Sequence, residues 1–98
     1  MTISAEKNNN QVTLKIEGRL DTTTAPSLEK VINELPANVT ELKLDMSQLA
    51  YVSSAGLRVL LSAQKKMNKI GSMKLTGVCE EVMEVFEMTG FADILDIE

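Results

Sequence analysis

A chain of 98 residues is long enough for one domain with a single hydrophobic core, and 44% hydrophobic with 24% charged residues is typical of a folded globular protein. The absence of histidine and the single cysteine exclude Ser-His-Asp triads, Cys-His pairs, histidine-ligated metals and disulfide frameworks. A net charge of −4 disfavours a nucleic acid as partner. We therefore predict one domain over residues 1–98 that is not an enzyme and holds no metal or cofactor.

Hydropathy and the N-terminal residues indicate where the protein is located. No stretch approaches the roughly 18 to 20 uninterrupted apolar residues of a membrane span, and residues 1–7 lack a basic region followed by an apolar core. The lone Cys79 fits a reducing compartment and is expected to be a small buried hydrophobe. We expect a cytoplasmic protein without membrane insertion.

The first elements are two short strands, predicted at residues 2–6 and 11–17 by alternating apolar and polar residues. Residues 8–10 are three asparagines, which suit a hairpin because Asn tolerates positive φ. The chain is expected to leave the second strand at residues 18–21.

A helix with Pro26 in its first turn follows, and Pro36 ends it. Residues 40–46 then read as a third strand, and residues 47–52 as a connection rich in apolar side chains.

A second helix is predicted from Ser54 or Ala55 to about Lys69, with Gly71 as its C-terminal cap. The remaining elements are a strand at residues 72–78, a helix at 80–88 and a short terminal segment at 91–97. The order β-β-α-β-α-β-α predicts an α/β fold in which a mixed sheet of four to five strands packs against helices. Binding sites in such sheets lie at the carboxyl ends of strands, which here indicates residues 45–56.

The entry to the second helix is the most informative stretch. Ser54 falls at the predicted N-cap, where its hydroxyl would accept a bond from a free backbone N–H. Gly56 in the first turn is unfavourable by roughly 0.5 to 1 kcal/mol and indicates a close approach by another group. A phosphate here would meet free N–H groups and the positive end of the helix dipole. The alternative is that the serines are a plain cap.

Two segments together carry a family resemblance. The first is residues 18–25, Gly-Arg-Leu-Asp-Thr-Thr-Thr-Ala, and the second is Asp-Met-Ser at 45–47 followed by Ser-Ser-Ala-Gly-Leu-Arg-Val-Leu-Leu at 53–61. In these segments, and in the Phe-Glu-Met-Thr-Gly-Phe run at 86–91, the chain closely resembles the STAS domain of bacterial anti-sigma factor antagonists. The resemblance covers nearly the whole chain and implies the STAS fold.

The resemblance also implies a switch. In that family the serine two residues before the helix glycine, Ser54 here, is phosphorylated by an anti-sigma factor that is itself a serine kinase, and a phosphatase reverses the modification. The unphosphorylated protein binds the anti-sigma factor and thereby frees the sigma factor for transcription. The partner-binding residues implied by this partner switching are those around the serine: Asp21, Thr22, Ser53, Ala55, Gly56, Arg58 and Val59.

The chain departs from the family pattern next to the phosphorylated serine. Many members carry an aspartate just before it and a serine or threonine just after it, whereas this chain has Ser53 and Ala55. Ser53 is therefore the alternative phosphorylation site. A second function is also compatible with the resemblance, namely a constitutive STAS scaffold or a subunit of a lipid-transport or stressosome-like complex.

Several residues have a structural and a functional interpretation. Asp21 either caps the turn before the threonines or helps to engage the kinase, and Asp45 with Ser47 is expected to bond the backbone of the connection. An acid/base enzyme that uses the two aspartates is disfavoured because neither has an apparent partner. Met83 and Met88 are predicted to fill the core.

The second helix has an apolar arc of roughly 200°, wider than packing on one sheet requires, because Val59 and Ile70 extend it. This width predicts a partner groove beside Ser54 that is rimmed by Arg58. The opposite, polar stripe of the helix consists of Arg58, Ser62, Lys65 and Lys69.

Overall fold

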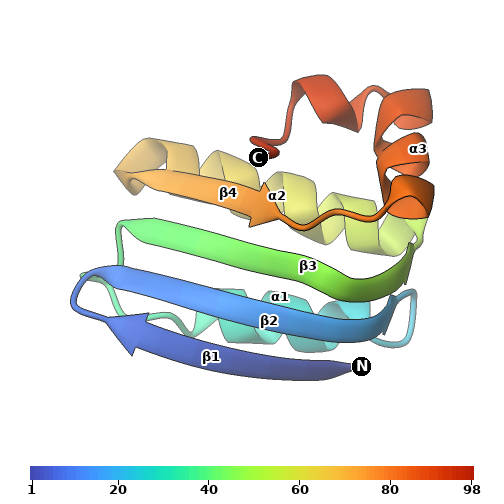
Figure 1. The fold of residues 1–98 in the computed structure, drawn as a ribbon. Coiled ribbons are helices and arrows are strands. Elements are labelled where there is room, and N and C mark those ends of the chain that lie inside the picture. The colour runs from blue at the N-terminus through green and yellow to red at the C-terminus, as the bar shows by residue number, and fades with distance from the viewer.

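The computed structural model describes all 98 residues and contains one mixed sheet with the strand order β1-β2-β3-β4 (Figure 1). The strands are β1 (Thr2–Asn8), β2 (Gln11–Leu20), β3 (Glu41–Val52) and β4 (Ser72–Thr76). The first pair is antiparallel, and β2, β3 and β4 are parallel. Asn9 has a φ of 58°, as the hairpin prediction required. A fifth strand does not form, but Ile97 makes one parallel bridge to Leu75.

Three α-helices and one short 3₁₀ helix cover the sheet. They are α1 (Ala25–Asn33), α2 (Ser54–Ile70), α3 (Glu80–Thr89) and η1 (Phe91–Asp93). Figure 1 shows α1 and α2 side by side on one face of the sheet, with α3 beside the end of β3. The buried apolar side chains form a single cluster of 23 residues, so the helices and the sheet share one core. No helix has both the length and the apolar character needed to cross a membrane.

The main difference from the predicted elements concerns the ends of β2 and β3. The alternation of residues predicts strand ends at 17 and 46, whereas β2 continues to Leu20 and β3 to Val52. The two extensions pair with each other, Gly18 with Leu49 and Leu20 with Val52, across two irregularities in register. The predicted connection at 47–52 is therefore strand, and it holds the two strand ends side by side.

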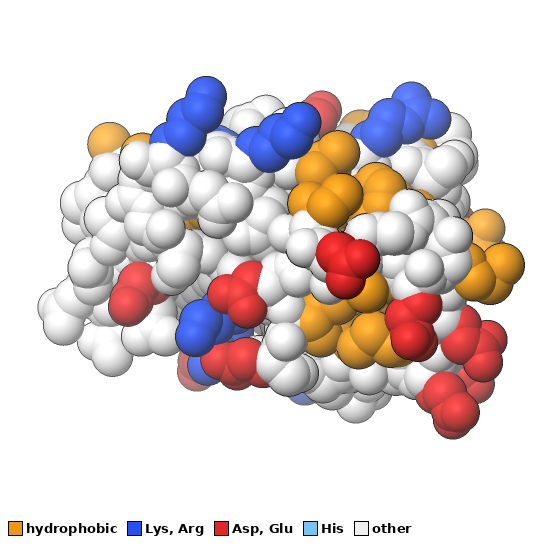
Figure 2. Space-filling model, turned by 90° about the horizontal axis from the view of Figure 1, so that it is seen from above, with side chains coloured by type: hydrophobic (Ala, Val, Ile, Leu, Met, Phe, Trp, Pro, Cys, Tyr) orange, Lys and Arg blue, Asp and Glu red, His pale blue; other side chains and the backbone are white.

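Charge is distributed unevenly over the molecule. α2 contains four basic residues and no acidic one, while residues 80–98 contain seven acidic residues and no basic one. Figure 2 shows acidic side chains around and below an apolar patch, basic side chains along the upper margin, and a further basic group among the acidic side chains at the lower left. Met88 is 87% exposed, so its prediction as core filler was wrong, whereas Met83 packs against the core as predicted.

Candidate functional site

The start of α2 is fixed by the end of β2. The N–H of Ser53 donates to the carbonyl oxygen of Leu20 at 2.8 Å, and the Ser53 hydroxyl accepts from the N–H of Gly56 at 3.3 Å. Ser53 has extended φ and ψ of −97° and 175° and is the N-cap, while Ser54 is already helical. The prediction that Ser54 is the N-cap was therefore wrong by one residue, because β3 runs up to Val52 and the chain turns at Ser53.

Ser54 consequently has a free hydroxyl. The side chain is exposed, no hydrogen bond engages its Oγ, and the first turn of α2 contains no acidic residue. Its neighbour Ala55 is half-buried. Ser54 is thus accessible to a modifying enzyme at a helix end whose unpaired N–H groups favour negative charge.

The close approach predicted at Gly56 is made by Leu20. A Cβ placed on Gly56 would lie 2.7 Å from Cγ of Leu20 and 3.0 Å from its carbonyl oxygen. Leu20 is completely buried, so it has little room to move. Gly56 is therefore required for packing α2 on the end of β2, and the contact places Asp21 beside the start of α2.

Asp21 caps the turn that leads into α1. Its Oδ1 accepts from the hydroxyl of Thr23 at 2.8 Å and from the N–H groups of Thr23 at 3.0 Å and Thr24 at 3.1 Å. The hydrogen bond from the Thr23 hydroxyl, helped by the two backbone N–H groups, holds the pKa of Asp21 below its ordinary value. The structural interpretation of this aspartate is confirmed. Its second carboxylate oxygen lies 4.0 Å from Nε of Arg19.

Asp45 and Ser47 form a similar local bond inside β3. Oδ1 of Asp45 accepts from the Ser47 hydroxyl at 2.7 Å and from its N–H at 3.0 Å, as predicted for a structural pair. The hydroxyl bond, followed by the backbone bond, lowers the pKa of Asp45. The pair sits where the register between β2 and β3 shifts, so it stabilises the irregular part of the strand.

A shallow groove runs between the start of α1 and the first turns of α2. Its lining residues are Thr22, Ala25, Pro26, Glu29, Ala55, Arg58, Val59 and Ser62. It brings together four of the predicted partner-binding residues, one from the turn before α1 and three from α2. Val59 is only 8% exposed and is buried in the core cluster. The wide apolar arc of α2 is therefore explained in part by α1 packing beside it, rather than by a partner alone.

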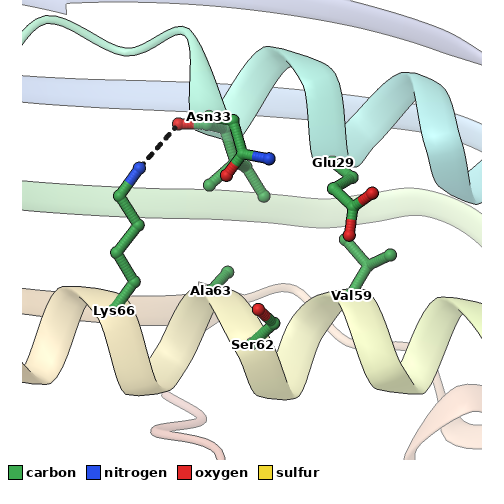
Figure 3. Close-up of a pocket in the computed structure, with 7 residues that line it drawn as sticks. Glu29, Asn33, Val59, Ser62, Ala63 and Lys66 are labelled. Atoms are coloured by element: carbon green, nitrogen blue, oxygen red, sulfur yellow. Dashed lines mark hydrogen bonds between the residues drawn. The ribbon is translucent and has the colours of Figure 1, made fainter.

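A second hollow lies further along the same helix pair. Figure 3 shows Glu29 and Asn33 of α1 facing Val59, Ser62, Ala63 and Lys66 of α2, with the Lys66 ammonium donating to the carbonyl oxygen of Ile32 at 3.4 Å. Its volume is about 20 Å³, room for about one water molecule. This hollow is too small for an organic ligand and is not part of the candidate site, which is the surface around Ser54.

Two exposed residues beside this surface are not predicted from the sequence. The Arg19 guanidinium stacks 4.1 Å from the centroid of the Tyr51 ring, and Tyr51 is 39% exposed. The pair is in register because β2 and β3 continue to Leu20 and Val52. In the sequence, Tyr51 is noticeable as an aromatic residue two positions before Ser53. It lies in residues 47–52, however, and the pattern of that segment indicates a connection and not a strand that would pair Tyr51 with Arg19.

The fold and the site define a class of protein: a small α/β domain that exposes a serine on the helix after its third strand. No group of three or more acidic or cysteine side chains is placed to hold a metal ion. The sequence profile of the STAS domain matches residues 2–98, and the chain belongs to this family.

Similar proteins include anti-sigma factor antagonists. The anti-sigma-B factor antagonist of Bacillus subtilis (strain 168) is 30% identical over 98 residues, which cover 99% of this chain and 90% of that protein. The crystal structure of an anti-sigma factor antagonist from Mycobacterium paratuberculosis has a TM-score of 0.86 at 23% identity, over 98% of this chain and 83% of the other. The anti-sigma factor antagonist SpoIIAA in its unphosphorylated form has a TM-score of 0.77 at 16% identity, over 99% and 88%. These two structures have the same fold as this chain.

Proposed function

We propose that this chain is a cytoplasmic anti-sigma factor antagonist that catalyses no reaction itself. When Ser54 is unmodified, the chain binds an anti-sigma factor kinase, and the sigma factor is released. Phosphorylation of Ser54 by that kinase ends the binding, and a phosphatase restores it. The observation that carries the proposal is the exposed and unbonded Ser54 hydroxyl on the first turn of α2. The resemblance to the Bacillus subtilis anti-sigma-B factor antagonist supports the class of partner.

The proposed modification is a phosphoryl transfer. The Ser54 Oγ attacks the γ-phosphorus of ATP, the bond to the bridging oxygen breaks, ADP leaves, and a catalytic base of the kinase accepts the hydroxyl proton. The product carries a charge of about −1.5 to −2 and three acceptor oxygens. A phosphatase adds water across the ester, which returns the hydroxyl and releases inorganic phosphate.

Ser54 is a better acceptor than Ser53. The Ser53 hydroxyl is half-buried and bonded to the N–H of Gly56, so its modification would break the N-cap. The Ser54 hydroxyl has no bond to lose. Kinase treatment followed by mass spectrometric site mapping is expected to place the phosphate on Ser54, and a phosphate found on Ser53 would contradict this assignment.

The proposed partner surface is the groove together with its rim. Asp21, Thr22, Ser53, Ala55 and Arg58 are exposed or half-buried around Ser54 and can touch a partner. Gly56 and Val59 are buried and support the surface from below. A phosphate at Ser54 would place negative charge in the middle of this surface, which opposes a partner that fits the unmodified form.

A charge substitution tests the switch. We expect Ser54→Asp to weaken binding of the anti-sigma factor kinase at least tenfold, because a carboxylate places charge in the middle of the interface. Ser54→Ala should bind normally and accept no phosphate. Titration calorimetry measures both affinities, and circular dichroism checks that the variants are folded.

Ser4→Asp is the matched control. Ser4 is an exposed serine on the edge strand β1, so the substitution adds the same negative charge outside the proposed partner surface. Its affinity should equal that of the unmodified chain. Equal affinities of Ser54→Asp and Ser54→Ala would contradict the switch and favour constitutive docking, as in a scaffold or transport complex.

A further inference from the structure

Arg58 is a basic side chain without an acidic partner. It lies on α2 four residues after Ser54, it is exposed, and none of the ion pairs of the structure involves it. No acidic residue exists anywhere on α2, and the acid on the facing wall of the groove, Glu29 of α1, does not pair with it. The guanidinium is therefore available to a new negative group.

Residues four apart on a helix lie on the same face, with Cβ atoms about 5–6 Å from each other. An acidic group that precedes a basic one at this spacing has the more favourable orientation. The guanidinium has paired N–H donors that match two phosphate oxygens, which a lysine ammonium does not. Positions 54 and 58 thus have the spacing, the order and the chemistry of an intrahelical phosphate–arginine pair.

We propose that Arg58 binds the phosphate on Ser54 within its own helix. In the unmodified chain, Arg58 is free on the rim of the groove, where its positive charge is available to the anti-sigma factor. After modification the phosphate engages Arg58, so the partner loses a cationic contact as well as meeting a new negative charge. This inference rests on Ser54 being the site of phosphorylation.

The pair has a measurable signature that needs no partner protein. A neighbouring cation favours the doubly charged form of a phosphate, so Arg58 should lower the second pKa of phosphoserine, which is ordinarily about 6. The N–H groups at the start of α2 lower it as well, but they are the same whether or not Arg58 is present. A comparison of variants at position 58 therefore isolates the contribution of Arg58.

The experiment uses the full chain with phosphoserine installed at position 54 by genetic encoding, so that no kinase is required. A ³¹P NMR titration gives the pKa of the phosphate in the unchanged background, in Arg58→Gln and in Lys65→Gln. Lys65 is an exposed basic residue of the same helix, seven positions further on, and is the matched control for loss of one positive charge.

We expect the phosphate pKa to rise by at least about 0.3 unit in Arg58→Gln and to change by less than half as much in Lys65→Gln. Arg58→Lys should give an intermediate value, because the lysine keeps the charge and loses the paired donors. The same pKa in Arg58→Gln and in the unchanged background would overturn the inference. A kinase that fails to modify Ser54 would contradict the proposed function, but it would not alter the phosphate pKa values that test Arg58.

Discussion

At the scale of a single residue, the two serines at the start of α2 have different roles because the backbone changes from extended to helical between them. Ser53 is extended and uses its hydroxyl to cap the helix, whereas Ser54 is helical and leaves its hydroxyl free. Aspartate and serine are both favoured N-cap residues. The aspartate that many members of the family carry just before the phosphorylated serine is therefore replaced here by a residue that can fill the same capping role.

Substitution of Ser53 tests this capping role. We expect Ser53→Ala to lower the free energy of unfolding by about 1 kcal/mol, because the N–H of Gly56 loses its acceptor. Ser53→Asp should stay within about 0.5 kcal/mol of the original chain, since a carboxylate is an equally good cap. Urea unfolding measures both values. Ser62→Ala, at an exposed serine in the middle of the same helix, is the control, and a similar loss there would contradict the role.

Gly56 shows what a sequence can predict at this scale. A glycine in the first turn of a helix indicates that something approaches closely, and this prediction was correct. The approaching group is Leu20, which lies on a different element and is 36 positions away in sequence. No local pattern identifies such a contact, because it depends on how β2 and α2 are placed in the folded chain.

At the scale of elements, the ends of the strands could not be predicted from alternation. Between Met46 and Val52 the buried residues of β3 are three apart, at Met46, Leu49 and Val52, because the register with β2 shifts. A period of three resembles neither a regular strand nor a full helix turn, so the pattern indicates a connection instead of a strand. The regular parts of the strands, such as the alternation from Val12 to Lys15, have no register shift and were predicted correctly.

The turn between β2 and α1 should respond to acid. The pKa of Asp21 is lower in the folded chain than its ordinary value of 3.8, so the unfolded chain binds a proton more readily as the pH falls. The stability that Asp21 contributes is therefore present above about pH 4 and is lost as the pH falls through the lower, folded pKa. The pKa of Asp45 is lowered in the same direction and adds to this loss.

We expect Asp21→Asn to keep the turn, because the amide oxygen still accepts hydrogen bonds, and to make stability less dependent on pH below about 4. Urea unfolding at a series of pH values from neutral to strongly acidic measures the slope. Glu6→Gln removes an exposed carboxylate on the edge strand β1 and serves as the control. An unchanged slope in Asp21→Asn would show that the hydrogen bonds to its carboxylate do not contribute.

At the scale of the whole molecule, one buried polar residue joins the C-terminal segment to the core. Gln64 is 3% exposed, its side-chain amide donates to the carbonyl oxygen of Met73 at 3.3 Å, and its Oε1 accepts from the N–H of Asp96 at 3.2 Å. The bridge between Leu75 and Ile97 lies next to it. The sequence predicts the segment at 91–97 only as a short terminal element, because its attachment depends on residues of α2 and β4.

Gln64→Ala should lower the free energy of unfolding by about 1–3 kcal/mol, because it removes the buried amide that donates to the carbonyl oxygen of Met73 and accepts from the N–H of Asp96. Amide hydrogen exchange measured by NMR should become faster first at Asp96 and Glu98, whose N–H groups bond to Gln64 and to Leu75. Gln48→Ala, at an exposed glutamine of β3, is the control. Unchanged protection at the C-terminal amides would contradict the anchoring role.

The uneven distribution of charge gives the molecule an electric dipole that its net charge of −4 conceals. Such a dipole orients a protein in the field of an approaching partner before any contact forms, over distances of about 8 Å at physiological ionic strength. The four basic residues of α2 are the positive end of this dipole. A phosphate with a charge of about −1.5 to −2 on the same helix would cancel nearly half of the positive charge of those four residues. With a partner whose facing surface is acidic, the proposed modification would thus slow the encounter itself, and added salt should reduce the difference in association rate between the two forms.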